Sequence, residues 1–277
     1  MAPQQSDKYT AINNVPESLN RIHTDEGARE YGYAGGLVPG IAMFSYACET
    51  IRKVGGDQWV DSGFTQMRYS APVYDGGTIE VTAESVGAPG SNGEHSGIFR
   101  VTDHHAHLCG SGRFVDRDIN AYPGSREHSP VQPKWPDVKP LIGTTLLATE
   151  RLGSVSLTPD VSEMVAYMEE LGLDPSYYVD RGTYQLGFLA RMYVLLIQAN
   201  FERVGPGIHA GTDIQVIRPI RFGESITVRG RVDRIFRRKG QGFWAFELEW
   251  VDEDDSPCLW ATHTAVYDVK KRTSQAA

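Results

Sequence analysis

The sequence predicts an α+β protein built from two tandem copies of one unit, each a long buried helix wrapped by a curved antiparallel sheet. The first observation is an internal repeat, in which Gly40 aligns with Gly187 and Tyr46 with Tyr193 at an offset of 147 residues. Further pairs align at the same offset: Thr65 with Thr212, Pro72 with Pro219, Gly76 with Gly223, Ile79 with Ile226 and Val81 with Val228. The second observation is that each copy has an apolar helical stretch followed by β-type sequence. A sheet that curls round such a helix can cover it.

The helical stretches are apolar nearly all round. In the first copy, apolar residues recur every three to four positions from Leu37 to Val54, and Gly40 stands at the expected start of the helix. In the second copy, the stretch from Gly187 to Phe201 is apolar on almost every side. We therefore expect both helices to lie inside the protein.

Alternating patterns predict the strands. Apolar positions alternate over 79–83, after an Asp-Gly-Gly turn, and over 226–232 in the second copy. Further strands are expected at 98–102, 107–115, 242–251 and 258–267, which makes a sheet of about five strands in each copy. The segment between the copies is rich in proline and charge, so we predict an N-terminal unit over 1–118, a linker over 119–140 and a C-terminal unit over 141–277.

Composition narrows the class of protein. Lys and Arg number 27 against 35 Asp and Glu, a formal net charge of −8, which argues against nucleic acid or an anionic membrane as a partner. No apolar stretch is long enough to cross a bilayer, and the polar amino terminus lacks the apolar core of a secretory signal. The cysteines Cys48, Cys109 and Cys258 lie far apart without a CxxC pair, as is typical of a reduced compartment. We expect a cytoplasmic protein.

One segment resembles a known family. From Asn20 to Gly40 the chain is similar to the hydratase motif of MaoC-like hydratases and dehydratases, which have a hotdog fold, here in tandem as a double hotdog. The matching residues are Asn20, Ile22, His23, Asp25, Glu26, Ala28, Gly32 and Gly40. The resemblance implies that His23 moves a proton, that the Gly40 N–H holds the thioester oxygen, and that Asn20 positions the loop or binds water.

Chemistry supports this arrangement of residues. Hydrating an enoyl thioester requires a group that transfers a proton and donors that stabilise the developing enolate. The free N–H groups and positive dipole end of a helix starting at Gly40 would supply the donors.

The chain also departs from the family motif. The catalytic Asp of the family lies five positions before the His, where this chain has Ser18, and the spacing from His23 to Ala28 is one residue shorter. Asp25 is the catalytic carboxylate that we assign beside His23 and Gly40. To substrate binding we assign Asn20, Glu17, Glu26, Pro39, Tyr46 and His209. In the second copy Glu170 stands where the first has His23, so we expect the active centre in the first copy.

Each assignment has a structural alternative. His23 and His209 are also consistent with a loop histidine and a strand-end histidine, and Gly40 with close packing at the helix start. Asp25 and Glu26 suit a solvated helix start, and Tyr46 suits core packing. His104, His105 and His107 fall in a predicted hairpin, and His95 and His128 have no partner at ligand spacing, so we predict no metal and no cofactor.

We therefore predict a MaoC-like lyase that hydrates an α,β-unsaturated thioester or dehydrates a 3-hydroxyacyl or polyketide-like substrate, carried on CoA or a carrier protein. The alternatives are a specialised lyase, cyclase or thioesterase that uses the same fold, and a noncatalytic acyl-binding subunit. The basic run from Arg234 to Gly242 is interpreted as a hairpin edge, with phosphate docking as the alternative. A homodimer is expected from the resemblance.

Overall fold

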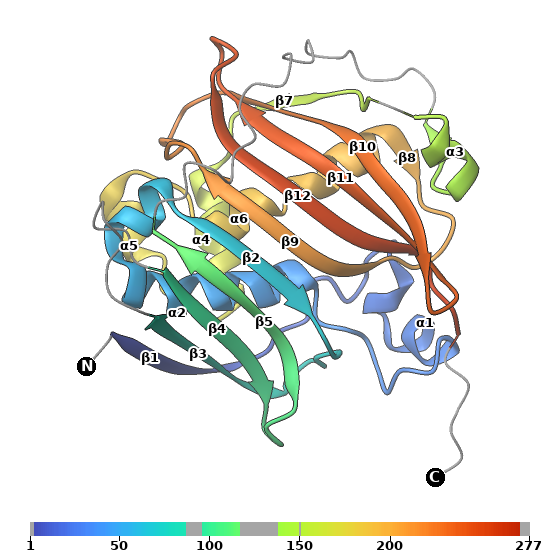
Figure 1. Cartoon of the computed structure of the whole chain (residues 1–277), viewed down its shortest axis with the longest axis horizontal. Coiled ribbons are helices and arrows are strands. Elements are labelled where there is room, and N and C mark those ends of the chain that lie inside the picture. The colour runs from blue at the N-terminus through green and yellow to red at the C-terminus, as the bar shows by residue number, and fades with distance from the viewer. Residues whose placement is uncertain (1–2, 87–95, 117–137, 150, 272–277) are drawn as a thin grey trace.

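The computed structural model describes residues 3–86, 96–116, 138–149 and 151–271 (Figure 1). Its main feature is a ten-stranded antiparallel sheet. The first copy contributes β1 (Gln4–Thr10), β2 (Phe64–Tyr69), β3 (Thr78–Val86), β4 (Ser96–Asp103) and β5 (Leu108–Val115). The second copy contributes β7 (Val155–Leu157), β9 (Ile208–Val216), β10 (Ile226–Arg238), β11 (Gln241–Val251) and β12 (Pro257–Asp268). A separate pair, β6 (Lys139–Pro140) and β8 (Phe201–Glu202), is parallel.

The two copies meet in the middle of the sheet. There β2 pairs with β9, with Thr65 opposite Ile214 and Met67 opposite Thr212. Outward from this junction the order is β5, β4, β3, β1 on one side and β12, β11, β10, β7 on the other. The second copy thus repeats the strand order of the first, which confirms the tandem α+β fold predicted from the internal repeat.

The helices pack on one face of this sheet, as Figure 1 shows for α2, α4 and α6. They are η1 (Arg21–His23), α1 (Asp25–Glu30), α2 (Gly40–Ser62), α3 (Gly143–Leu147), α4 (Val161–Glu170), α5 (Ser176–Arg181), α6 (Leu186–Ala190) and α7 (Tyr193–Asn200). None of the helices in the described ranges combines the length and apolarity that a membrane crossing requires.

Helix α2 is buried as the sequence predicts. Every residue from Ile41 to Ile51 is buried, because the helix lies between the sheet and the helices of the second copy. It begins at Gly40 directly after Pro39, whose ring removes a backbone donor and disfavours helical backbone in the preceding residue. Gly56 (φ 63°, ψ −162°) then breaks the helical path, a conformation open to glycine.

The second helical stretch differs from the prediction of one enclosed helix. It divides into α6 and α7 at Arg191, whose guanidinium stacks 4.9 Å from the centre of the Tyr167 ring. Leu195 of α7 is 42% exposed and lines a large cavity, so one side of this helix faces open space instead of the core. Its all-round apolar character therefore reflects a cavity wall as well as burial.

Strand β1 was missed by sequence reasoning. Its sequence, QQSDKYT, is polar throughout, and every second side chain is exposed because the strand forms one edge of the sheet beside β3. Hydrophobic alternation is weak in such a strand. The predicted boundaries of the two units stay a prediction, and residues 119–137 of the predicted linker lie outside the described ranges.

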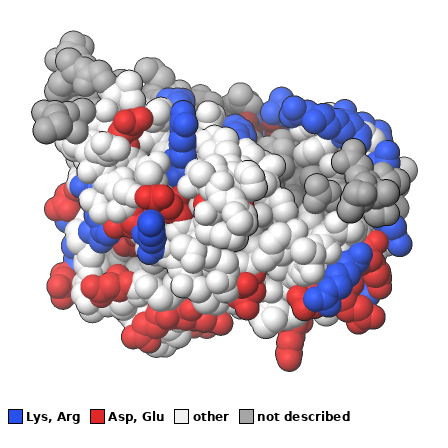
Figure 2. Space-filling view, turned by 90° about the horizontal axis from the view of Figure 1, so that it is seen from below, with Lys and Arg blue, Asp and Glu red and all other residues white. Residues whose placement is uncertain are grey.

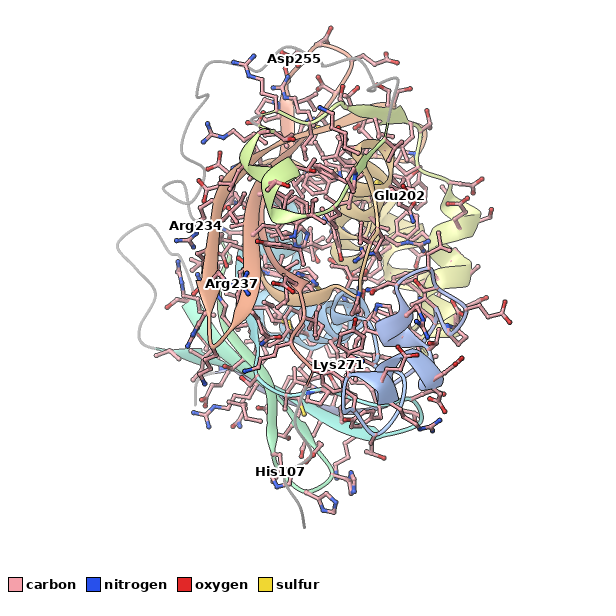
Figure 3. All side chains as sticks on the ribbon, turned by 90° about the vertical axis from the view of Figure 1, so that its right-hand side faces the viewer. His107, Glu202, Arg234, Arg237, Asp255 and Lys271 are labelled. Carbon is pink, nitrogen blue, oxygen red and sulfur yellow. The ribbon has the colours of Figure 1, made fainter. Side chains whose placement is uncertain are left out.

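The surface carries charges of both signs. Figure 2 shows acidic and basic side chains on the same face with wide uncharged areas between them. The basic run lies in the hairpin between β10 and β11, where Lys239 (φ 50°) and Gly240 (φ 78°) make the turn. Arg237, which Figure 3 labels, pairs with Asp268 of β12 at 3.0 Å.

Candidate active site

The segment between β1 and α2 holds His23 in place. Ile22 is 1% exposed, and its carbonyl accepts a hydrogen bond from the N–H of Leu37 at 3.0 Å. The Asn13 side chain donates to the carbonyl oxygen of His23 at 2.7 Å. Burial of Ile22 and these two hydrogen bonds fix the backbone around His23.

The His23 ring has a defined proton position. Its Nδ1 lies 2.7 Å from the carbonyl oxygen of Leu37, and because a carbonyl oxygen only accepts, Nδ1 carries the hydrogen. The lone pair of the neutral ring is therefore on Nε2. Burial lowers the pKa of His23; the Leu37 hydrogen bond acts against this, and the positive charge of Arg203 adds to it. His23 is thus a neutral base near pH 7.

Asn20 links this loop to the second copy. Its Nδ2 donates to the carbonyl oxygen of Gly207 at 2.8 Å, and its Oδ1 accepts from the N–H of Gly207 at 2.9 Å. The same Nδ2 lies 3.2 Å from Nε2 of His23. Asn20 therefore positions the histidine and joins the two copies at this point. The motif resemblance singled out Asn20, but sequence alone could not identify Gly207 as its partner.

The start of α2 is open to a ligand. The N–H groups of Gly40 and Ile41 donate no hydrogen bond within the described residues, and Pro39 supplies no side-chain cap. The Gly40 carbonyl accepts from the Tyr69 hydroxyl at 2.6 Å, which fixes this first turn. The helix dipole and the two free donors favour a negatively charged oxygen here.

Gly40 is in contact with His209 from the second copy. A Cβ atom at position 40 would lie 2.8 Å from His209 Cβ and 2.9 Å from its Nδ1, so a larger residue would displace the ring. Close packing against His209 therefore explains why position 40 needs a glycine. This packing leaves the Gly40 N–H available to a ligand.

Behind His209 is a buried polar cluster. His209 Nε2 lies 2.7 Å from Thr212 Oγ1 and 2.9 Å from His263 Nδ1. Burial lowers the pKa of His209 to about 4 and that of His263 well below its ordinary value, so both rings are neutral. His209 Nδ1 and His263 Nε2 have no hydrogen-bond partner among the described residues. Sequence reasoning missed His263, because only the pairing of β9 with β12 brings it to His209.

These groups surround a cavity of about 1500 Å³ between the two copies. Its lining includes five of the predicted site residues: Asn20, His23, Pro39, Gly40 and His209. The second copy also contributes Arg203 and Tyr193, which sequence reasoning did not identify. A cavity of this volume has room for an extended acyl chain.

Four other predicted site residues do not line this cavity. The Asp25 side chain is 67% exposed, and its pKa is lowered by a hydrogen bond from the N–H of Gly36 at 2.9 Å and by an ion pair with Arg29 at 2.9 Å. Glu17 and Glu26 are exposed. Tyr46 is fully buried, and its hydroxyl donates to the carbonyl oxygen of Thr10 at 3.1 Å. None of these four residues is therefore placed to contact a ligand in the cavity.

Among the described residues, no carboxylate takes the place beside His23 of the aspartate that the family motif has. Ser18 Oγ accepts from the backbone N–H of Asn20 at 3.1 Å, and within the described residues no Asp or Glu side chain hydrogen-bonds His23. The acidic residues of the cavity wall are Asp160, Glu163, Glu170 and Glu202. Asp160 already caps α4. Among the described residues, the hydrogen-bond partners of the His23 ring are thus Asn20 and the Leu37 carbonyl.

The other histidine cluster lies far from this site. His104, His105 and His107 occupy the turn between β4 and β5, as predicted, and His107 is at its tip (Figure 3). Its Nδ1 lies 3.2 Å from Asp103 Oδ2. In the described part of the chain no three His, Cys, Asp or Glu side chains are arranged to hold a metal ion. His95 and His128 fall outside the described ranges.

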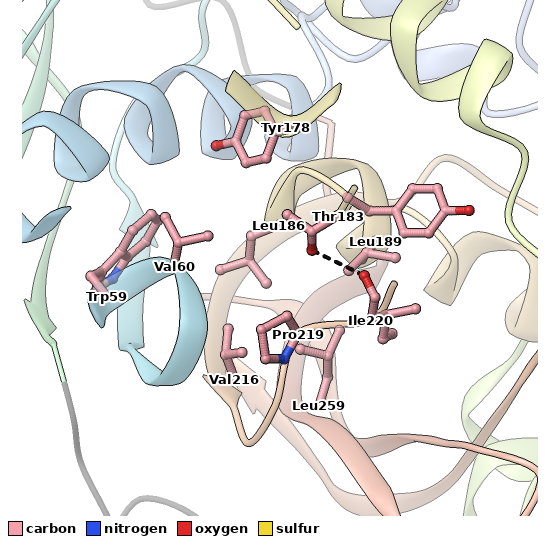
Figure 4. A pocket seen from close by; sticks show the side chains of 11 residues that line it. Trp59, Val60, Tyr178, Thr183, Leu186, Leu189, Val216, Pro219, Ile220 and Leu259 are labelled. Atoms are coloured by element: carbon pink, nitrogen blue, oxygen red, sulfur yellow. Dashed lines mark hydrogen bonds between the residues drawn. The ribbon is translucent and has the colours of Figure 1, made fainter. Parts of the chain in front are cut away.

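A second, much smaller pocket lies where α2 meets the second copy (Figure 4). Its volume is about 10 Å³, and its walls are mostly apolar. Thr183 satisfies its hydroxyl there by donating to the carbonyl oxygen of Ile220 at 3.0 Å. A space of this size holds at most about one water molecule. The large cavity is therefore the candidate site.

Comparison with solved structures identifies the fold. A protein from Chloroflexus aurantiacus described as a MaoC domain protein dehydratase is 11% identical, with a TM-score of 0.68 over 99% of this chain and 96% of that one. A conserved hypothetical protein from Mycobacterium tuberculosis with a double hotdog fold is 11% identical, with a TM-score of 0.64 over 96% of each chain. A 12:0-ACP thioesterase from Umbellularia californica is 11% identical, with a TM-score of 0.54 over 95% and 93%.

These likenesses define a double hotdog protein. The predicted resemblance to MaoC-like dehydratases is confirmed at the level of the fold, which the dehydratase and thioesterase neighbours share. Neither protein-family models nor curated proteins give a match to the sequence.

Proposed function

We propose that this protein is a hydro-lyase that adds water to an α,β-unsaturated acyl thioester, or removes it from a 3-hydroxyacyl thioester. The observation that carries the proposal is the neutral Nε2 of His23, in the same cavity as the uncapped start of α2. A proton acceptor and an oxyanion site are the two elements that the reaction requires. The fold-level likeness to MaoC-like dehydratases supports the same class.

A single histidine can complete the reaction. Nε2 of His23 takes a proton from water while the water oxygen bonds to the β-carbon, and the electron pair of the C=C bond moves towards the thioester carbonyl. The N–H groups of Gly40 and Ile41 stabilise the resulting enolate oxygen. The protonated ring then delivers its proton to the α-carbon, the carbonyl forms again and His23 returns to its neutral state. Dehydration is the reverse sequence.

Asn20 has a positioning role in this scheme. Its contact with Nε2, at 3.2 Å, is longer than its two hydrogen bonds to Gly207. Water can take over the longer contact while the Gly207 bonds keep Asn20 in place. Burial lowers the pKa of His23 and so favours the neutral form, which is the form that accepts a proton.

The test is an absorbance assay of enoyl loss with short, medium and branched 2-enoyl-CoA thioesters. We expect wild-type protein to hydrate at least one of them, and His23→Gln to reduce kcat about 10²- to 10⁴-fold, the range for loss of a general base. Glu170→Gln is the matched control, since Glu170 lines the cavity at the position equivalent to His23. It should keep wild-type turnover.

Three outcomes would contradict the proposal: no hydration of any thioester, equal turnover by His23→Gln, or thiol release without hydration. The last would identify a thioesterase, and binding without turnover would identify an acyl-binding subunit. Thermal melting of each variant separates loss of chemistry from loss of fold.

The cytoplasmic location and the homodimer belong to the proposal as well. Light scattering tests the second, since a mass of 30.7 kDa at all concentrations would exclude a dimer.

A further inference from the structure

Arg203 presents a partly buried positive charge to the cavity. It follows β8 in the second copy, is half-buried and lines the cavity wall. Within the described ranges its guanidinium makes no hydrogen bond and no ion pair. Burial lowers its pKa, and the opposing influence comes from Tyr193 rather than from a carboxylate.

Two other partly buried arginines of this chain are paired with carboxylates, whereas Arg191 stacks on aromatic rings. Arg218 contacts Glu224 at 2.9 Å and Asp252 at 2.7 Å, and Arg181 contacts Asp57 at 2.8 Å and Asp61 at 2.7 Å. These carboxylates raise the pKa of both arginines, the opposite direction to Arg203. Removing a guanidinium from water without a partner is costly. A ligand anion would supply the missing partner.

The guanidinium lies close to the proposed reacting atoms. Its Nη1 would be 2.3 Å from a Cβ atom at Gly207, so it packs directly against that glycine. Gly207 in turn is bonded by Asn20, whose amide reaches Nε2 of His23. The charge of Arg203 also acts on the pKa of both His23 and Tyr193. Arg203 is therefore connected to His23 through Gly207 and Asn20, and an anion bound to Arg203 would lie near the proposed base.

This position distinguishes between two sources of negative charge. The phosphates of CoA or of a carrier arm are separated from the thioester by the whole pantetheine chain. The anion at Arg203 must instead belong to the acyl group. A carboxylate suits a guanidinium, because the planar fork can make two parallel hydrogen bonds to it.

We propose that Arg203 selects acyl thioesters whose acyl chain ends in a carboxylate, so that the substrates are monothioesters of dicarboxylic acids. This inference names the substrate class of the proposed hydro-lyase and rests on that proposal. Binding of the carboxylate at Arg203 would orient the double bond between Nε2 of His23 and the start of α2. Arg203 is thus a specificity-determining residue.

The experiment compares two series of CoA thioesters of equal chain length. One series consists of monothioesters of unsaturated dicarboxylic acids, and the other of neutral 2-enoyl thioesters. We expect kcat/KM of the wild type to be about 10- to 100-fold higher for the carboxylate series, the effect of a hydrogen-bonded charge pair. Arg203→Gln should remove this preference, mainly through KM, and Arg203→Lys should restore part of it.

Arg191→Gln is the matched control. Arg191 also lines the cavity but stacks on Tyr167 and Phe188, so its loss should leave the preference unchanged. Hydration of both series at equal kcat/KM would overturn the inference while leaving the proposed function in place. An equal loss for both series in Arg203→Gln would also overturn it, because Arg203 would then act on the enolate.

A binding measurement is independent of turnover. Calorimetry with the saturated CoA monothioester of a dicarboxylic acid should show about 10- to 100-fold tighter binding than with its neutral counterpart, and Arg203→Gln should abolish the difference. This result without hydration of any thioester would uphold the carboxylate site and contradict the hydro-lyase. Equal binding of both probes, or binding of neither, would overturn the inference.

Discussion

The two copies begin their central helices with equivalent glycines in opposite surroundings. Gly40 starts α2 at the cavity wall, where its N–H has no hydrogen-bond partner and no side-chain cap in the described part of the chain. Gly187 lies in the first turn of α6, where the Gln185 side chain accepts from the N–H of Phe188 at 2.8 Å. A Cβ atom at Gly187 would lie 2.1 Å from Ser45 Oγ of the first copy. One helix start is thus open to a ligand and the other is closed by the core.

For the equivalent tyrosines, it is the residue of the second copy that faces the cavity. Tyr46 of α2 is fully buried and hydrogen-bonded to β1, whereas Tyr193 of α7 faces the cavity, with its ring centre 4.3 Å from that of His263. In the proposed reaction the first copy would supply the proton acceptor and the oxyanion donors, and the second copy would supply the charge of Arg203. Both copies line the cavity, although the motif lies in the first.

The largest contrast is expected from the glycine pair. Gly187→Ala should lower the free energy of unfolding by about 2 to 3 kcal/mol, because the new methyl group overlaps Ser45 in a closed core. The new methyl group of Gly40→Ala meets His209 Cβ at 2.8 Å and its ring Nδ1 at 2.9 Å. It should cost about 1 kcal/mol, but it should lower hydration about tenfold by shifting the oxyanion donors. Urea unfolding and kcat measure the two effects. Equal destabilisation by both variants would contradict this difference between the helix starts.

A smaller contrast is expected from two amides. Asn20→Ala removes both Gly207 hydrogen bonds and the contact with His23, so it should cost about 1 to 3 kcal/mol and lower kcat about tenfold. Gln185→Ala removes the cap of α6 and should cost about 1 to 2 kcal/mol. It should leave kcat unchanged in the protein that remains folded. A loss of kcat in Gln185→Ala would show that the closed helix start also contributes to turnover.

The smallest effect is a displacement of the pH profile. Because burial lowers the pKa of His23, the base stays neutral as the pH falls through 6.5, and activity is lost only at lower pH. His209, with a pKa of about 4, should add no step in this range. The profile of kcat/KM between about pH 5 and pH 8 should have one acid limb with its midpoint below 6.5. A midpoint at or above 6.5 would exclude His23, in this environment, as the base.

Local pattern predicted part of the elements. The buried helix from Gly40 and the hairpin at His104 and His105 are confirmed, because periodicity and turn residues act over a few positions along the chain. The repeat is confirmed by the matching strand order of the two copies. The missed elements lack a clear local pattern. Strand β1 is polar because it is a sheet edge, and the break between α6 and α7 depends on contacts of Arg191 with rings distant in sequence.

Only part of the candidate site could be predicted from the sequence. His23, Asn20 and Gly40 belong to one short motif, so the sequence by itself identified them and the loop that carries them. Gly207, Arg203 and His263 carry no motif, and their relation to His23 depends on how the second copy pairs and packs against the first. The tertiary structure alone decided which helix start stays open and which charge faces it. The physical reason is that burial and hydrogen-bond partners are set by contacts between residues far apart in the chain, which local periodicity does not encode.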